Sequence, residues 1–234
     1  MTDLSAFPIS RKWPAQHPDR IQLYSLNTPN GVKASIMLEE TGLAYEPHLV
    51  DFGAHDQTSA AFLSLNPNNK IPAIIDPNGP GGKPLPLWES GAILIYLAEK
   101  SGKFLSRDPA LRYETLQWLF FQVGHIGPMF GQVGFFVKMG GKDFEDKRPR
   151  DRYVDEARRL FGVLDAHMAG RDWIMGDYGI ADIATWNWVN AMTSSPETAP
   201  LIGTDKFANV KRVLAQYLAR PAVQKGLQIP KKPG

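Results

Sequence analysis

Two polar residues flank a proline at the start of a predicted helix, in the run Thr28-Pro29-Asn30. We expect Thr28 to cap this helix and Pro29 to take its first position, where a missing N–H has no consequence. The free backbone N–H groups of such a helix end favour an anion, for example a thiolate. The Thr28 hydroxyl and the Asn30 amide would be the local donors. Capping alone also explains this run, so it points to a site only together with other features.

A second feature is the proline at the entry of a predicted strand, in Asn68-Asn69-Lys70-Ile71-Pro72. Because proline cannot donate to a strand ladder, it belongs at the start or the edge of a sheet. A cis peptide bond before Pro72 would turn the Ile71 backbone N–H and C=O outward, toward an extended peptide ligand. A trans proline in an ordinary turn is the alternative.

The third feature is Trp88-Glu89-Ser90-Gly91, where a helix follows a strand without a loop. The Ser90 hydroxyl and the amides near it would hold a carboxylate at the helix N-terminus. The Glu89 carboxylate could meet an ammonium group. Common helix capping again explains the pair on its own.

Several other chemistries are excluded by composition. The chain has no cysteine, so it has no structural disulfide, no thiolate metal site and no thiol nucleophile of its own. Its five histidines are scattered, and neither His-Glu-x-x-His nor Gly-x-Ser-x-Gly occurs, so we expect no metal site. Gly81-Gly82-Lys83 lacks the spacing and the helix that a phosphate loop needs. The formal net charge of +2 points to neither nucleic acid nor an anionic membrane.

The first half of the chain alternates short apolar strands with helices. Hydrophobic patterning and turn residues predict the order β-α-β-α-β-β-α. The predicted strands are residues 21–26, 45–50, 71–75 and 85–88, and the predicted helices are residues 28–41, 59–65 and 89–100. Gly42 is expected to end the first helix. The loop at residues 76–84 should join the last two strands as a hairpin.

Strand patterns stop after about residue 104, and only helical spacing follows. We therefore predict an α/β domain at residues 21–104 and an all-helical domain at residues 105–234, with residues 1–20 as an extension wrapped on, or hanging off, the first domain. Residues 115–137 carry no Lys, Arg, Asp or Glu, but their glutamines, glycines and proline favour a buried helix over a membrane span. The first 20 residues lack an apolar signal-peptide core, so we expect a cytoplasmic protein.

Taken together, the three features resemble the glutathione transferases. The Thr-Pro-Asn start and the run Pro-Asn-Asn-Lys-Ile-Pro-Ala-Ile are similar to the nu class and to its fungal regulator relatives, and the resemblance covers about residues 21–226. It implies a thioredoxin-like domain followed by an all-helical C-terminal domain, and a homodimer. It also implies glutathione as the co-substrate.

The resemblance also assigns roles to individual residues. Thr28 and Asn30 would face the glutathione sulfur as the catalytic residues. The remaining glutathione contacts would come from Gln57, Lys70, Ile71, Pro72, Glu89, Ser90 and, in the second domain, Arg152. Ile71 would pair with the cysteinyl part through its backbone, and Glu89 and Ser90 would hold the γ-glutamyl end. Tyr178-Gly179-Ile180-Ala181-Asp182 resembles the family's capping box, where Asp182 is structural and Gly179 replaces the usual Ser or Thr; a glycine cap should cost only a few tenths of a kcal/mol.

The activity that this resemblance implies is glutathione-dependent disulfide reduction, with weaker conjugation of electrophiles. Cleavage of aryl-ether or glutathionyl adducts is an alternative activity, and a glutathione-binding regulatory module without turnover is an alternative function. The second substrate would therefore be an electrophile or a disulfide. Candidate residues for its pocket are Phe130, Phe135, Phe136 and Met139, although core packing is the commoner role of aromatic residues.

Overall fold

The computed structural model describes residues 4–231, which form two compact units. The first unit comprises residues 4–103 together with residues 221–231, and the second comprises residues 104–220. The break after Lys103 lies one residue from the boundary expected from the sequence.

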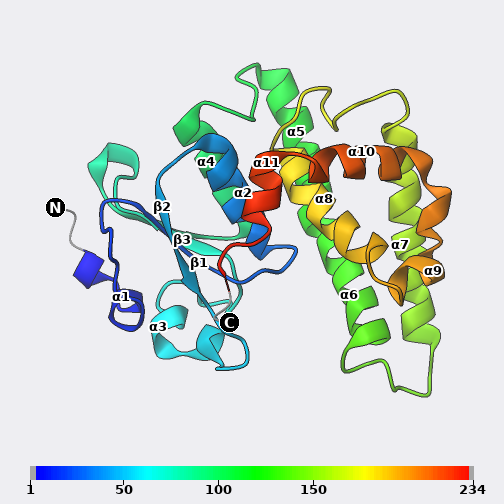
Figure 1. The fold of residues 1–234 in the computed structure, drawn as a ribbon, viewed down its shortest axis with the longest axis horizontal. Coiled ribbons are helices and arrows are strands. Elements are labelled where there is room, and N and C mark those ends of the chain that lie inside the picture. Colours follow the sequence, from blue (N-terminus) through cyan, green and yellow to red (C-terminus); the bar gives the residue numbers. More distant parts are fainter. Residues whose placement is uncertain (1–3, 232–234) are drawn as a thin grey trace. The chain divides into compact units, whose positions relative to one another are not determined.

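A four-stranded mixed sheet lies at the centre of the first unit (Figure 1). Its strands are β1 (Ile21–Ser25), β2 (Tyr45–Leu49), β3 (Ala73–Asp76) and β4 (Leu85–Trp88), in the order β2-β1-β3-β4. β2 runs parallel to β1, whereas β3 is antiparallel to both β1 and β4. The parallel pair needs a crossover, which α2 (Gly31–Thr41) provides. The predicted element order and the β3-β4 hairpin are confirmed.

Helices cover both faces of this sheet, which explains why every residue of β1 is buried. α2 and α4 (Ser90–Ser101) pack together on one face. On the other face lie α1 (Ile9–Lys12) and α3 (Ala60–Leu63), with short 3-10 turns at η1 (Leu4–Ala6), η2 (Asp56–Thr58) and η3 (Pro80–Gly82) in the same unit. Gly42 ends α2 in the left-handed conformation, with φ of 74°, as predicted.

The N-terminal extension is part of the first unit's core. Leu4 and Ile9 are buried in one cluster with Tyr24 and Phe62. The Trp13 indole N–H donates to the Leu49 carbonyl oxygen at 2.9 Å, which ties the extension to the edge strand β2. The described part of residues 1–20 is therefore wrapped on the domain and does not hang off it.

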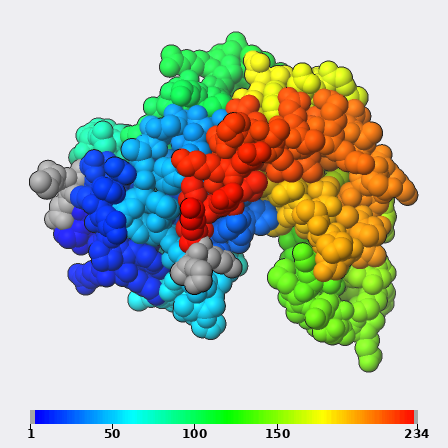
Figure 2. Space-filling model, viewed as in Figure 1, coloured from blue at the N-terminus to red at the C-terminus, as the bar shows by residue number. Residues whose placement is uncertain are grey.

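The C-terminal helix α11 (Pro221–Gly226) also belongs to the first unit, unlike the range 105–234 expected for the helical domain. It packs on α2, where the Ser35 hydroxyl donates to the Gly226 carbonyl oxygen at 2.7 Å. A Cβ at Gly226 would lie 2.8 Å or less from the Ile36 backbone, so the two helices meet at a glycine contact. In Figure 2 this segment, in red, lies against the blue surface of α2.

The second unit is all-helical, which confirms the predicted fold class. Its helices are α5 (Pro109–Phe121), α6 (Gly127–Lys138), α7 (Arg148–His167), α8 (Ile180–Thr193), α9 (Thr198–Ile202) and α10 (Ala208–Leu218), with a 3-10 turn η5 (Thr204–Lys206). The uncharged residues 115–137 are helical throughout, as predicted, and a π-helical turn, η4 (Gln122–Ile126), joins α5 to α6 within them. Within residues 4–231 no helix combines the length and the apolar character that a bilayer crossing requires.

The start of α8 explains the glycine in the capping box. Asp182 is fully buried and accepts hydrogen bonds from the backbone N–H groups of Ile174 and Gly179 and from the Trp186 indole, at 2.9–3.1 Å. A Cβ at Gly179 would lie 2.9 Å from the Phe104 carbonyl oxygen. A side chain at this position would therefore require a shift of the Phe104 backbone. The helix forms with the glycine cap, as expected.

Candidate functional site

The sheet topology brings the three sequence features to one edge of the first unit. Tyr24, Ala73 and Trp88 face one another across β1, β3 and β4 and form one row of the sheet. After this row, β1 leads into the start of α2, and β4 leads into Glu89-Ser90. Because β3 runs in the opposite direction to both, Ile71-Pro72, which precede β3 in the chain, lie at the same end of the sheet. β2 is parallel to β1, so its C-terminal end, which leads to Gln57, lies at the same edge.

Thr28 caps the entry of α2, although the regular helix begins three residues later than predicted. The Thr28 hydroxyl oxygen accepts a hydrogen bond from the Gly31 backbone N–H at 3.1 Å. A hydroxyl has one proton to donate and two lone pairs, so this bond leaves the proton unused. Within the described chain the Thr28 hydroxyl donates a hydrogen bond to no group. Thr28 and Asn30 are both half-buried and so remain accessible from the site edge.

Gly31 sets the close packing of this corner. A Cβ at this position would lie 1.9 Å from the Leu26 carbonyl oxygen and 3.0 Å from Ile71 Cδ1. Only glycine fits such an approach. The contact places the entry of α2 directly beside Ile71, so two of the three sequence features touch.

The peptide bond between Ile71 and Pro72 is cis, which decides between the cis and trans alternatives that the sequence left open. Ile71 precedes β3 and takes no part in the register of either strand pair. Its side chain is buried, at 7% exposure. The Ile71 main chain thus lies beyond the ladder at the edge where α2 begins.

Glu89 and Ser90 stand at the N-terminus of α4. Ser90 is buried at 6% exposure, whereas Glu89 is exposed. Glu89 has φ of 71° and ψ of 116°, a region that a residue with a side chain rarely adopts. Strained backbone of this kind clusters at ligand sites, because the surrounding structure must hold it there.

Sequence reasoning missed Lys33, which is 1% exposed and lies on α2. Its ammonium Nζ is 3.4 Å from the Ser90 hydroxyl oxygen. Burial lowers the pKa of Lys33 to about 7, against the charge of Glu89, which raises it. Lysine is almost never fully buried unless it is paired. The sequence alone does not show this burial, so it gave no signal for Lys33.

The remaining predicted residues are less closely tied to this edge. Gln57 is half-buried in η2, and its side-chain oxygen is buried without a hydrogen-bond partner among the described residues. Lys70 is exposed, and its carbonyl oxygen accepts from the Asn66 amide. Arg152 is exposed on α7 and belongs to the second unit, so its role in the site stays a prediction.

The aromatic residues expected to line the second-substrate pocket divide into two groups. Phe130 is fully buried and stacks on Phe161 with ring centres 5.2 Å apart, so it is a core residue and not a pocket residue. Phe135 and Met139 are exposed at 38% and 55%, and Phe136 contacts Phe135 edge to face.

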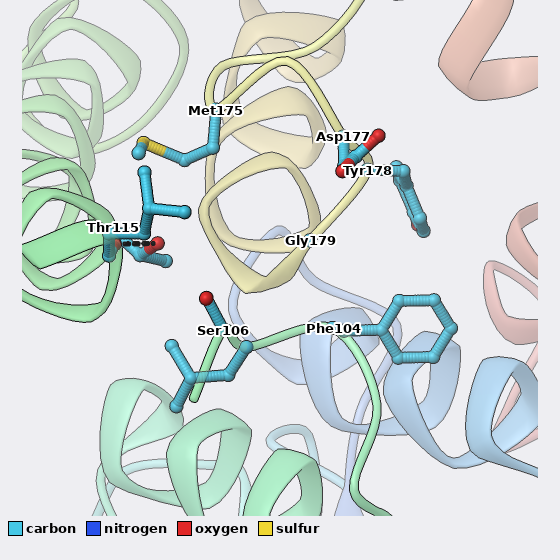
Figure 3. A pocket seen from close by; sticks show the side chains of 9 residues that line it. Phe104, Ser106, Thr115, Met175, Asp177, Tyr178 and Gly179 are labelled. Carbon is cyan, nitrogen blue, oxygen red and sulfur yellow. Dashed lines mark hydrogen bonds between the residues drawn. The ribbon is translucent and has the colours of Figure 1, made fainter. Parts of the chain in front are cut away.

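A hollow of about 310 Å³ lies within the second unit, near the start of α8 (Figure 3). Two of its hydroxyl groups serve local structure. The Thr115 hydroxyl donates to the Leu111 carbonyl oxygen at 2.7 Å, and the Ser106 oxygen accepts from the Asp108 backbone N–H at 3.1 Å. The arrangement gives this hollow no evident chemistry. Over residues 4–231 no group of three or more His, Asp or Glu side chains is placed to hold a metal ion.

Comparison with known proteins agrees with the geometry of the first unit. The glutathione S-transferase N-terminal domain model matches residues 20–99, and the C-terminal domain model of that family matches residues 126–221. The disulfide-bond oxidoreductase YfcG of Escherichia coli is 48% identical over 209 residues, which cover 88% of this chain and 94% of YfcG.

Two solved structures are closer still. A glutathione transferase from Burkholderia graminis, with two glutathione molecules per subunit, is 65% identical with a TM-score of 0.98, over 100% of this chain and 98% of that chain. A glutathione transferase from Pseudomonas putida, with one glutathione disulfide per subunit, is 67% identical with a TM-score of 0.96, over 98% of this chain and 100% of that chain. The chain therefore belongs to the glutathione transferase family of enzymes.

Proposed function

We propose that this protein binds glutathione at the sheet edge beside Thr28 and uses the glutathione thiolate to reduce disulfides. The observation that carries the proposal is the meeting of the α2 entry, Ile71 and the α4 entry at one edge of a cysteine-free chain. The sulfur would lie against Thr28 and Asn30. The cysteinyl backbone would pair with Ile71, and the γ-glutamyl end would bind Glu89 and Ser90.

The site stabilises a thiolate without supplying a base. A free thiol has a pKa of about 8.5, so only a few per cent is ionised at neutral pH. Neither threonine nor asparagine is a strong base, so the thiol proton would leave to solvent. The unused proton of the Thr28 hydroxyl and the N–H groups at the α2 entry would then stabilise the sulfur anion.

The absence of cysteine fixes the order of the thiol exchanges. The bound thiolate attacks one sulfur of the substrate disulfide, forms a mixed disulfide with glutathione, and releases the first substrate thiolate. A second glutathione thiolate attacks the glutathionyl sulfur, which releases the second substrate thiolate and forms glutathione disulfide. Both released thiolates take protons from solvent, and two glutathione molecules are oxidised for each disulfide reduced.

The two solved relatives support this scheme. One holds two glutathione molecules per subunit and the other holds one glutathione disulfide, which are the reduced and the oxidised forms of the same pair. We expect this chain to bind both forms. Phe135, Phe136 and Met139 remain our candidates for contacts with the second substrate, and conjugation or adduct cleavage would be weaker activities of the same thiolate.

We also propose that the protein belongs to the nu class, is cytoplasmic and forms a homodimer. Further contacts with glutathione would come from Gln57, Lys70, Pro72 and Arg152. The dimer is supported by Tyr113 and Phe120, which lie seven residues apart on α5 and are exposed at 72% and 63%. Exposed aromatic residues in a line on one helix favour a protein partner. Sedimentation equilibrium should give twice the chain mass, and a monomer at micromolar concentration would contradict the dimer.

Calorimetric titration with glutathione, followed by turnover of hydroxyethyl disulfide, tests the enzyme against the regulatory module. Binding with turnover that falls in Thr28→Val and not in Thr41→Val supports the proposed enzyme. Thr41 is a matched control because it lies at the other end of α2 and its hydroxyl donates within that helix. Binding without turnover would favour the regulatory module, and absence of binding would refute both.

A further inference from the structure

The buried lysine of α2 contacts a hydroxyl group at the N-terminus of α4. Lys33 Nζ lies 3.4 Å from the Ser90 oxygen, and both side chains are more than nine-tenths buried. The first amides of α4 also point toward this end and carry a partial positive charge. Two positive features therefore converge on Ser90, next to the carboxylate of Glu89.

The protonation state of Lys33 sets the direction of this hydrogen bond. An ammonium group has three protons to donate and no lone pair to accept with. When Lys33 is protonated, the Ser90 oxygen is therefore the acceptor, and the Ser90 proton is left to point elsewhere. A neutral lysine amine could instead accept that proton, which would turn the Ser90 hydroxyl toward Lys33.

Resting on the glutathione site proposed above, we infer that Lys33 is a positioning residue for the γ-glutamyl carboxylate. Its ammonium holds the Ser90 oxygen as an acceptor, which directs the Ser90 proton toward the ligand carboxylate. The ammonium also places a positive charge 3.4 Å from the Ser90 oxygen. The γ-glutamyl end carries an ammonium and a carboxylate, and these match Glu89 and the Ser90–Lys33 pair respectively.

The electrostatics of the free protein agree with this geometry. Burial lowers the pKa of Lys33 to about 7, and the nearby Glu89 charge offsets this only in part. Of the other elements packed on α2, α11 brings Lys225, which pairs with Glu39 at 2.7 Å, and β1 carries no carboxylate or ammonium. A second carboxylate, supplied by the ligand, would favour the protonated lysine.

The test uses two ligands without an ionisable thiol. One is S-methylglutathione, and the other is the same molecule with the γ-glutamyl carboxylate replaced by hydrogen. In the intact protein the first should bind more tightly. Lys33→Met should weaken the binding of S-methylglutathione by about tenfold or more, because a hydrogen bond to a charged group contributes about a tenfold change in affinity. The affinity for the second ligand should stay nearly unchanged. Lys33→Arg should restore part of the difference.

Lys100→Met is the control, because Lys100 lies near the C-terminal end of α4, away from Ser90, and pairs with Asp76 at 2.8 Å. It should leave the affinity ratio of the two ligands unchanged. A Lys33→Met protein with the unaltered ratio would overturn the role of Lys33. If Ser90→Ala still weakened the binding of S-methylglutathione in that case, the proposed glutathione site would remain supported. Failure of the unmodified protein to bind S-methylglutathione would refute the proposed function instead.

A second readout is the uptake of protons when the unmodified protein binds its ligand. At pH 8, above the pKa of Lys33 in the free protein, binding of S-methylglutathione should take up protons, because the ligand carboxylate raises that pKa. Calorimetry in buffers of different ionisation enthalpy measures this uptake. Lys33→Met should abolish the part due to the lysine. Binding without proton uptake in the unmodified protein would overturn the inference.

Discussion

Replacing Thr28 with valine keeps the side-chain shape and removes the hydroxyl, and with it two separate interactions. The first is the cap on Gly31, where the hydroxyl oxygen accepts the backbone N–H at 3.1 Å. Loss of such a cap costs about 1 kcal/mol, which for a chain of this size lowers the melting temperature by about 2–4 °C. The second is the proposed hydrogen bond from the hydroxyl proton to the glutathione sulfur.

Loss of that second interaction should raise the pKa of the bound thiol by about one unit, equivalent to about 1.4 kcal/mol. Ultraviolet absorbance of the thiolate during a pH titration measures this pKa in the complex. Thr28→Ser retains an oxygen and a proton and should restore most of both effects. Thr41→Val should lower stability without moving the thiol pKa, since its hydroxyl donates to the Met37 carbonyl oxygen within α2.

The two effects can be separated because they are measured on different states. A Thr28→Val protein that melts lower but binds glutathione with an unchanged thiol pKa would refute the role of Thr28 in thiolate stabilisation. It would leave Thr28 as a structural cap, which is the ordinary explanation of the sequence run.

Three further predictions concern the scaffold. Ile9→Ala should lower the free energy of unfolding by about 2–5 kcal/mol in urea denaturation, because Ile9 is fully buried in the first unit's core; a loss near zero would mean that the extension is dispensable. Gly179→Ser should destabilise the protein by about 1–3 kcal/mol, because its Cβ would lie 2.9 Å from the Phe104 carbonyl oxygen, and a gain would show that helix capping outweighs this contact. Burial raises the pKa of Asp182 to about 6, so its protonated form favours folding. That contribution is complete below about pH 4 and is lost as the pH rises through 6. Relative to Asp182→Asn, stability should therefore fall across this range by an amount on the order of 3 kcal/mol, and a flat difference would contradict the shift.

The sequence predicted those parts of the fold that local signals control. Strand alternation, the glycine at position 42 and the turn residues at 76–84 gave the element order of the first unit. Helix ends were less accurate, since α2 begins at Gly31 and not at Thr28. The four residues of α1 are too few to show a helical period, so their place in the core could not be predicted.

The missing parts depend on contacts between residues far apart in the chain. A lone lysine in a helix is usually solvent-exposed, whereas Lys33 is buried in the first unit, where α4 packs on α2 and Ser90 contacts the lysine ammonium. Helical spacing also could not show that α11 belongs to the first unit. Gly179 is a similar case, because the backbone that excludes a side chain there belongs to Phe104.

The most direct test of the central claim is a crystal structure of this chain grown with reduced glutathione. We predict the glutathione sulfur within hydrogen-bond distance of the Thr28 hydroxyl oxygen, the cysteinyl backbone paired with Ile71, and the γ-glutamyl carboxylate on Ser90. A tripeptide bound elsewhere, or bound at this edge with its sulfur turned away from Thr28, would contradict the account.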